Sequence, residues 1–167
     1  MQKEKTVALL QYCIYPKPML VLPKPIAWGR GNEQRACQAS VKYMNSHGHP
    51  GLETRRYGFV SHLEKGWLGA SPDAWVTDPS ENACNGISEF KCPFSKAGIH
   101  PEEACKDNSF CSTVVDGKVK LKHHHAYYHQ VQLQLFVAAD LYGCCDFCIF
   151  TNCGYLSRCF LAADHHP

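Results

Sequence analysis

The sequence predicts one α/β domain in which helices flank a central mixed β-sheet. Its 167 residues are enough for one core and too few for two comfortable domains. Segments with helical periodicity alternate with short segments rich in β-branched and aromatic residues, and this mixture is typical of a sheet covered by helices. The chain contains no internal repeat and no long low-complexity segment.

The first 27 residues are expected to form a short helix followed by a proline-rich connector. Residues 3–15 suit the helix, and the prolines at 16, 18, 23 and 25 then favour extended backbone, because proline fixes its own φ and restricts the residue before it. A long helix is expected over residues 29–47, with Gly31 or Asn32 as its cap. The apolar side of this helix would contain Ala36, Ala39, Val41, Tyr43 and Met44.

Short strands are expected in the middle of the chain. Residues 56–61 and 67–70 resemble neighbouring strands around a turn at residues 64–66. Residues 73–77 and 87–91 are two further strand candidates, each with β-branched or aromatic residues.

The second half of the chain combines a hairpin, two helices and two closing strands. Residues 101–105 are expected to form a brief helix that begins at a proline. Residues 113–119 contain a central Asp-Gly pair, which favours a hairpin turn with positive φ. A helix is expected over residues 125–141, followed by strands over residues 146–151 and 155–160.

Charge and cysteine content limit the classes of protein that fit. The formal net charge of +2 argues against a histone-like coat of positive charge, but not against an enzyme whose acidic metal ligands offset its basic residues. The eleven cysteines include the adjacent pair Cys144-Cys145. Their odd number, without a signal segment, favours reduced thiols inside a cell over a disulfide framework.

Membrane and secretory segments are not expected. No apolar run reaches the roughly 18 residues that a membrane span requires. The apolar stretch at residues 7–10 is too short for a secretory signal and no small-residue cleavage pattern follows it. We therefore expect an intracellular protein, in the cytoplasm or the nucleus, with no membrane partner.

An acidic side chain and a lysine share one face of the strand expected at residues 87–91. Because side chains alternate along a strand, Glu89 and Lys91 point to one side and Phe90 points into the opposite layer. The two charged residues would lie roughly 6 to 7 Å apart along the strand. A carboxylate that binds a metal, beside an ammonium that orients water or stabilises a phosphate charge, suits a hydrolytic site.

Two further carboxylates could complete a metal site. Asp73 follows Pro72, whose fixed backbone limits the movement of the next residue. Asp73 and Glu89 would suit Mg2+, which prefers octahedral oxygen coordination and keeps several water or substrate ligands. Glu33, on the expected long helix, could supply a third carboxylate. Taken singly, these features are usually an exposed ion pair, a turn and an exposed helix residue.

Four short motifs follow one another along the chain. They are WGRGNEQRA at residues 28–36, GASPD at 69–73, EFKCP at 89–93 and YYHQVQ at 127–132. In sequence and order they resemble the Gly-x-x-x-Glu-x-x-Ala helix, Gly-x-Ser-Pro-Asp element, Glu-x-Lys-Cys-Pro strand and Tyr-x-x-Gln-x-Gln helix of the lambda-exonuclease and YqaJ-type viral recombinase family. This family belongs to the PD-(D/E)XK nuclease superfamily, and the likeness spans residues 28 to about 151.

The resemblance implies a restriction-endonuclease-like α/β core over residues 28–160, followed by a tail at residues 161–167. It also implies a Mg2+-dependent DNA nuclease, with Mn2+ as a substitute metal. Such an enzyme would act as a 5′-to-3′ exonuclease on the ends of double-stranded DNA in recombination or repair. A homo-oligomer and a single-strand annealing partner are implied in the same way.

The same resemblance assigns roles to the acidic residues and the lysine. Glu33, Asp73 and Glu89 would hold the metal with help from the backbone carbonyl of Phe90. Lys91 would position the attacking water. These roles would make the three carboxylates and the lysine the catalytic centre.

The helix expected at residues 125–141 has a polar flank and an apolar flank. Helical spacing places Tyr127, Gln130 and Gln134 on one side. The neighbouring flank, expected to pack on the sheet, contains Val131, Leu135 and Ala138. Given the resemblance, Gln130 is expected to reach the catalytic site, whereas Gln132 is expected to face solvent.

Candidate DNA contacts lie in three places. The resemblance assigns a DNA phosphate, at the 5′ end in family members, to Ser71. Lys96 and a basic stretch are candidates for contacts to backbone phosphates, which position DNA without reading its sequence. The basic stretch consists of Lys118, Lys120, Lys122, His123, His124 and His125. It is equally well explained as a solvated hairpin and loop.

Two alternatives to a nuclease remain open. One is a catalytically decayed DNA-binding module of the same fold, although unneeded carboxylates would repel phosphate. The other is a zinc-stabilised interaction domain, because Cys145 and Cys148 have the spacing of a zinc knuckle and Cys144 and Cys153 lie nearby. This cluster lacks a second well-spaced pair, and Cys148 would also suit a buried strand.

Overall fold

The computed structural model describes residues 21–56, 58–81, 85–138, 144–152 and 154–162. The helix expected at residues 3–15 lies outside this part of the chain, as do residues 163–167 of the expected tail. None of the helices in the described ranges is both long and apolar enough to cross a membrane.

Helix α2 (Lys24–Ser46) begins earlier than the sequence predicts. The extended connector expected up to residue 27 is therefore wrong at its end: Pro23 caps the helix and Pro25 lies in its first turn. Proline is tolerated there because first-turn N–H groups have no partner within the helix. Gly31 and Asn32, expected as caps, lie inside the helix, and the Asn32 amide donates to the backbone carbonyl four residues earlier.

One stripe of α2 packs against the sheet. The side chains buried along the helix are Asn32, Ala36, Ser40 and Met44. They recur every four residues, which is the spacing of one helix face. Tyr43, expected on the apolar side, is exposed and stacks on His47 with ring centroids 3.9 Å apart.

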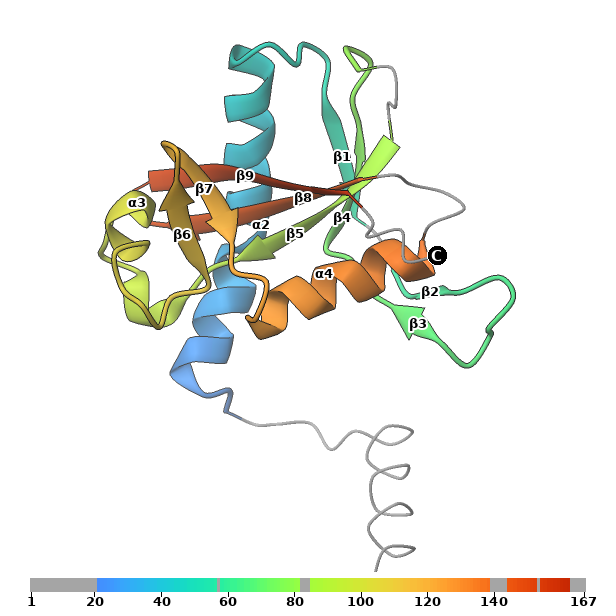
Figure 1. Cartoon of the computed structure of the whole chain (residues 1–167), viewed down its shortest axis with the longest axis horizontal. Helices are drawn as coiled ribbons and strands as arrows, with labels where there is room; N and C mark the ends of the chain where they lie inside the picture. The colour runs from blue at the N-terminus through green and yellow to red at the C-terminus, as the bar shows by residue number, and fades with distance from the viewer. Residues whose placement is uncertain (1–20, 57, 82–84, 139–143, 153, 163–167) are drawn as a thin grey trace, which may run out of the picture.

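The central sheet has five strands in the spatial order β1-β4-β5-β8-β9. Their bounds are β1 Glu53–Arg56, β4 Ala74–Thr77, β5 Asn85–Lys91, β8 Cys144–Thr151 and β9 Gly154–Ala162. Strands β5 and β8 run parallel, whereas the other neighbouring pairs are antiparallel. The mixed sheet predicted from the sequence is therefore confirmed (Figure 1).

The segment expected as one strand at residues 56–61 is divided between two sheets. Its first residue ends β1, which pairs with β4 in the central sheet. Its last two form β2 (Val60–Ser61), which pairs with β3 (Gly69–Ala70) in a separate two-stranded sheet. Trp67, expected in the second strand, precedes β3 and is 83% exposed. Strand β1 has mostly exposed side chains, so no apolar alternation marks it in the sequence.

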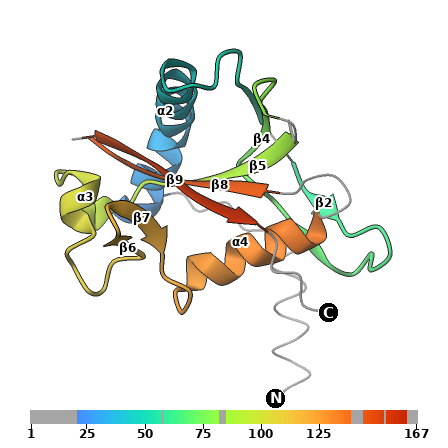
Figure 2. The ribbon, with the colours of Figure 1, turned by 45° about the horizontal axis from the view of Figure 1, so that its top comes forward.

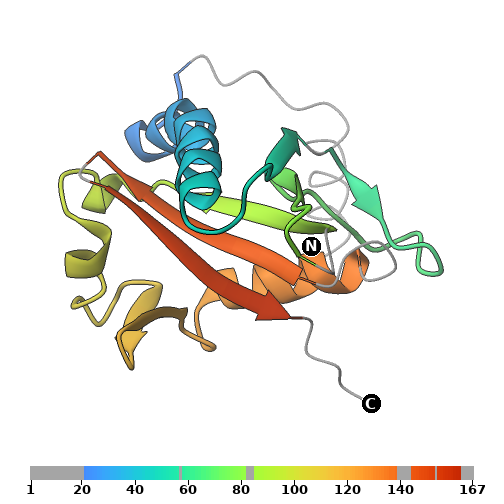
Figure 3. The ribbon, with the colours of Figure 1, turned by 90° about the horizontal axis from the view of Figure 1, so that it is seen from above.

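Helix α2 covers one face of the central sheet, and α4 with several smaller elements covers the other (Figures 1 and 3). The remaining elements are 3-10 helix η1 Phe94–Lys96, α3 Pro101–Ala104, β6 Ser112–Val115, β7 Lys118–Leu121 and α4 Ala126–Val137. The β6–β7 hairpin confirms the Asp-Gly turn, with φ of +53° at Asp116 and +70° at Gly117. Figure 2 shows α4 running from this hairpin towards β2.

The two faces of the sheet carry separate apolar clusters. The cluster on the α4 side includes Ile87, Val131, Leu135, Cys145 and Ile149. The cluster on the α2 side includes Ala36, Ala74, Phe90, Cys148 and Phe150. Because neighbouring residues of a strand face opposite sides, Glu89 and Lys91 share the α4 side with Ile87 while Phe90 packs under α2.

Candidate active site

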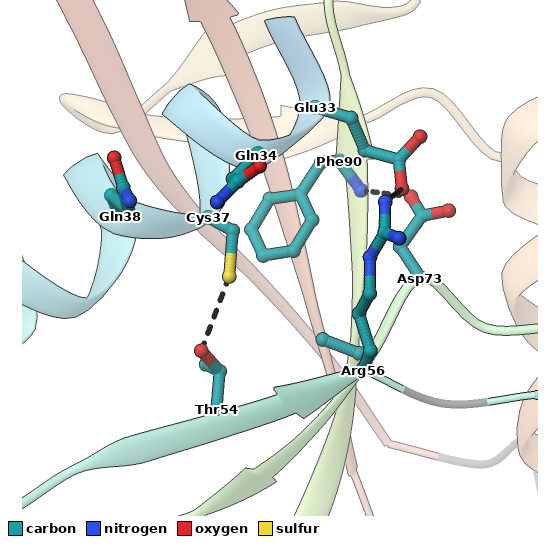
Figure 4. A pocket seen from close by; sticks show the side chains of 9 residues that line it. Glu33, Gln34, Cys37, Gln38, Thr54, Arg56, Asp73 and Phe90 are labelled. Atoms are coloured by element: carbon teal, nitrogen blue, oxygen red, sulfur yellow. Dashed lines mark hydrogen bonds and ion pairs between the residues drawn. The ribbon is translucent and has the colours of Figure 1, made fainter. Parts of the chain in front are cut away.

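Two carboxylates approach each other where α2 passes the start of β4. Glu33 lies on α2 and Asp73 immediately precedes β4, and Figure 4 shows both side chains reaching into the same space. The Oδ2 atom of Asp73 accepts a hydrogen bond of 2.7 Å from the backbone N–H of Phe90. Arg56 lies beside them, with its Nη2 atom 3.9 Å from Oε1 of Glu33 (Figure 4). The hydrogen bond ties the Ser-Pro-Asp element to β5.

The surroundings of Asp73 disfavour its ionised form. Burial has the largest effect and the charges of Glu89 and Glu33 add to it, so the pKa of Asp73 rises from its ordinary value of 3.8 to about 7. The Phe90 N–H and the charge of Lys91 act in the opposite direction but are outweighed. A carboxylate that is destabilised by other carboxylates would be stabilised by a bound cation.

Glu89 is held by three side chains that donate hydrogen bonds. The residue is 2% exposed, and its Oε1 atom accepts from Lys91 Nζ at 2.5 Å and from Gln130 Nε2 at 2.6 Å. Its Oε2 atom accepts from Gln134 Nε2 at 2.8 Å. A buried carboxylate needs such donors because an unpaired buried charge is costly. The structure thus brings Glu89, Lys91 and Gln130 into direct contact.

Lys91 lies between Glu89 and an aromatic ring. Its Nζ atom is 4.6 Å from the centroid of the Tyr127 ring, a distance at which a cation is attracted to the ring face. The Lys91 side chain is 18% exposed. Two neighbours therefore hold an ammonium that still reaches solvent beside Asp73 and Glu89.

A cavity of about 570 Å³ opens beside these residues. Its wall includes Arg30, Glu33, Asp73, Lys91 and Tyr127. A second cavity of about 300 Å³ also borders Glu33 and Asp73 and continues along α2 and β1 (Figure 4). Carboxylates and cationic side chains thus line the same open space, as a site for a metal-bound phosphate requires.

The donor chemistry of the three carboxylates fits a hard divalent cation. Glu33, Asp73 and Glu89 offer carboxylate oxygens, and Phe90 contributes a backbone carbonyl group nearby. Across the described ranges, these three carboxylates do not form a group whose ligand atoms all lie within 4.8 Å of one another. Oxygens that share one Mg2+ at about 2.1 Å are at most about 4.2 Å apart. Joint binding therefore requires at least one of the three side chains to turn.

A second polar cluster lies at the other end of β4. His49 Nδ1 is 2.6 Å from Asp78 Oδ2 and 3.7 Å from Glu81 Oε1, so these three residues have the spacing of metal ligands. Partial burial acts in the opposite direction, but hydrogen bonds from Ser80 and His49 lower the pKa of Asp78. These bonds join the loops after α2 and β4. The cluster contains none of the motif residues.

One contact of Glu89 was not predicted from the sequence. Gln134 lies on the same flank of α4 as Gln130, as the helical spacing predicts, and is 3% exposed. Which partner it meets depends on the placement of α4 over β5, and the sequence does not specify that placement. Gln132, expected to face solvent, is half-buried.

The two predicted phosphate-binding residues have different surroundings. Ser71 is exposed two residues before Asp73, and its backbone carbonyl lies 3.5 Å from Gln134 Nε2. The Nζ atom of Lys96 lies 2.6 Å from Oδ2 of Asp107. Ser71 is therefore open to a ligand beside the carboxylates, whereas the charge of Lys96 is matched by an aspartate.

Part of the predicted basic stretch has a structural role. A ring nitrogen of His125 accepts a hydrogen bond of 3.1 Å from the N–H of Tyr127 and so caps α4. Burial, followed by nearby positive charge, lowers the pKa of His125, which favours the neutral ring that can accept this bond. Lys118 and Lys120 remain exposed on the hairpin.

The cysteines with zinc-knuckle spacing do not converge. Cys145 packs in the cluster on the α4 side and Cys148 in the cluster on the α2 side, because residues three apart in a strand face opposite ways. The zinc-knuckle interpretation of this pair is therefore wrong, and both residues act as small buried side chains. Cys153 lies outside the described residues. The cysteines whose side chains the structure describes are free thiols, namely Cys37, Cys92, Cys105, Cys111, Cys145 and Cys148.

Comparisons with known proteins identify the family. The profile of the YqaJ-like viral recombinase domain matches residues 5–140. The crystal structure of an alkaline exonuclease (LHK-Exo) from Laribacter hongkongensis is similar at 20% identity with a TM-score of 0.59, and that of LHK-Exo in complex with dAMP at 20% identity with a TM-score of 0.61. Each alignment covers 98% of this chain and 69% of the exonuclease chain.

These comparisons also settle the fold. At such low identity the likeness to the exonuclease concerns the fold alone, and it confirms the restriction-endonuclease-like core predicted from the sequence. No curated protein matches the chain. Because the recombinase profile extends over most of the sequence, the chain belongs to the YqaJ-like viral recombinase family.

Proposed function

We propose that residues 28–160 form a magnesium-dependent deoxyribonuclease that degrades double-stranded DNA from its 5′ ends, in recombination or repair inside a cell. Family membership and the exonuclease fold support a DNA-hydrolysing enzyme. The single observation that carries the proposal is the buried Glu89 carboxylate, which contacts Lys91 and Gln130 and lies near Asp73, whose pKa is raised by burial and then by the charge of Glu89. A buried and a half-buried carboxylate beside a lysine are suited to metal-assisted hydrolysis.

Four groups of this chain would hold the metal. Glu33, Asp73 and Glu89 would provide carboxylate oxygens, and Phe90 its backbone carbonyl. Mg2+ is the expected ion and Mn2+ a substitute, since both accept oxygen ligands. When bound, the ion polarises the phosphate and lowers the pKa of a water molecule.

The side chains around Glu89 would orient the reacting groups. The ammonium of Lys91 would hold the attacking water in line with the phosphorus and stabilise the negative charge that develops on the phosphate. Tyr127 and Glu89 limit the positions that this ammonium can take. Gln130 would fix the Glu89 oxygen that it shares with Lys91.

DNA would approach along the cavity beside α2. The exposed Ser71 would bind a phosphate of the attacked strand. Lys96 would bind a DNA phosphate only after its ammonium leaves Asp107. Binding of this kind would weaken as salt rises. A homo-oligomer and a single-strand annealing protein are the partners that we propose.

The test is digestion of linear double-stranded DNA by the purified protein. One 5′ end would carry a phosphate or a hydroxyl group, the 3′ end a label, and reactions would contain Mg2+, Mn2+ or EDTA. We expect progressive shortening from the 5′ end with Mg2+, slower shortening without the 5′ phosphate, and none with EDTA. The Asp73→Ala variant, matched for purity and folding, should be inactive.

Two results would contradict the proposal. Equal activity of the Asp73→Ala variant would show that the cleavage comes from another site or from a contaminant. Binding of DNA by the wild-type protein without cleavage under every metal condition would favour the decayed DNA-binding module instead.

A further inference from the structure

Gln134 connects the two acidic segments of the site. It lies on α4, and its Nε2 atom is 2.8 Å from Oε2 of Glu89 and 3.5 Å from the backbone carbonyl of Ser71. Glu89 belongs to β5, whereas Ser71 stands two residues before Asp73. One amide group therefore reaches both the strand with the buried carboxylate and the loop that presents Asp73.

Packing alone does not account for a polar side chain at this position. Gln134 is 3% exposed, and its Oε1 atom is buried without a hydrogen-bond partner in the part of the chain that the structure describes. An unpaired buried carbonyl is unfavourable, and an apolar side chain of the same shape would avoid it. The interaction that explains a glutamine here is therefore the hydrogen bond that its amide N–H donates to Glu89.

We infer that Gln134 is a positioning residue that sets which oxygen of Glu89 faces the reaction. This inference rests on the nuclease function proposed above. The Gln134 amide holds Oε2, whereas Lys91 and Gln130 hold Oε1. Without the Gln134 bond, Oε2 would lose its donor and only the Oε1 bonds to Lys91 and Gln130 would resist rotation about the last torsion angle, which is a soft one.

Through its contact with Ser71, Gln134 also positions the loop that presents Asp73. Asp73 is already tied to β5 by the N–H of Phe90. The contact of Gln134 with the Ser71 carbonyl adds a tie two residues earlier. Gln134 therefore fixes the spacing between Glu89 and Asp73, on which shared binding of one ion depends.

The test compares substitutions of Gln134 with a control in the same helix. Gln134→Met keeps the length and the packing but removes the donor, and Gln134→Asn keeps an amide that is one methylene shorter. His129→Leu is the control, because His129 is exposed on α4. For each protein we would measure the melting temperature, Mg2+ affinity by calorimetry, and kcat and KM on linear double-stranded DNA.

Loss of a hydrogen-bond partner of a metal ligand is expected to reduce metal affinity or activity by about 10- to 100-fold. We expect Gln134→Met and Gln134→Asn to show this loss in Mg2+ affinity, in kcat or in both. Their KM for DNA should change less than about twofold, since Gln134 would not touch DNA. His129→Leu should match the wild type. Should Gln134→Met not fold, Gln134→Asn provides the same comparison.

The possible failures are distinguishable. Wild-type activity with unchanged Mg2+ affinity and kcat in a folded Gln134 variant would overturn the positioning role while leaving the nuclease function intact. Wild-type protein that binds Mg2+ without cleaving DNA, together with weaker Mg2+ binding in the variants, would support the positioning role and contradict the nuclease function. Wild-type protein that neither binds Mg2+ nor cleaves DNA would overturn both.

Discussion

Replacing Asp73 by asparagine is expected to stabilise the metal-free protein while abolishing its activity. The asparagine side chain has nearly the same shape, and its amide oxygen can still accept the hydrogen bond from the Phe90 N–H. It cannot ionise, so the substitution removes a charge that burial and the nearby Glu89 and Glu33 disfavour. The charge would therefore be maintained for function at the expense of stability.

The magnitude follows from the pKa of Asp73, which is 3.8 ordinarily and about 7 in the folded protein. A rise of this size corresponds to about 4 kcal/mol at most in the free energy of unfolding. Because the folded state binds the proton more tightly than the unfolded state, the wild type loses this stability as pH rises from 3.8 to about 7. Above that range the wild type has lost the full amount. Because the site can relax, the expected increase in the free energy of unfolding of Asp73→Asn over the wild type is about 2 to 4 kcal/mol.

The assay is urea denaturation of wild type and Asp73→Asn in EDTA, at about pH 8 and about pH 5. The variant should be more stable at the higher pH, and the difference should shrink by more than half at the lower pH. Adding Mg2+ at the higher pH should stabilise the wild type more than the variant, because a ligand stabilises the state that binds it. A variant that is less stable than the wild type, or a difference that is independent of pH, would refute this reasoning.

Three further predictions concern catalysis and folding. Lys91→Ala should lower kcat by at least about 100-fold with little change in DNA affinity, and unchanged single-turnover rates would contradict its role. Leu135→Ala, in the core under α4, should lower the free energy of unfolding by about 2 to 5 kcal/mol; a loss below that range in urea denaturation would mean that α4 does not pack as described. Gly117→Ala, at a φ of +70° in open space, should cost about 1 kcal/mol through backbone strain alone, and an unchanged urea midpoint would argue against this turn.

The parts of the fold that the sequence predicts are those with a strong local signal. The parallel pair β5–β8 lies in the buried centre, and its apolar residues mark both strands. The Asp-Gly turn and the apolar flank of α4 are marked in the same way. The edge strand β1 is defined only by pairing with β4, and helix α2 begins at Lys24 between two prolines that also suit an extended connector. In both cases the contacts that determine the element form only in the folded chain, so no local sequence pattern marks it.

In the candidate site, too, the residues marked by a local sequence pattern were predicted and those whose partners depend on the fold were not. Alternation along β5 was sufficient to predict that Glu89 and Lys91 share a face. Helical spacing placed Gln130 on a polar flank, and the family resemblance was needed to predict that it reaches the site. The role of Gln134 was not predicted, because its flank is known from spacing while its partner depends on how α4 lies over β5. The ion pair of Lys96 with Asp107 was missed for the same reason, since these residues meet only across a folded loop.

The most direct test of the account is a crystal structure of the protein soaked with Mn2+, with the ion located by its anomalous scattering. We expect a strong peak bounded by Glu33, Asp73 and Glu89, with at least one of these side chains turned from its position in the metal-free protein. A peak found only at His49, Asp78 and Glu81, or no peak between the three carboxylates at saturating Mn2+, would contradict the proposed catalytic centre.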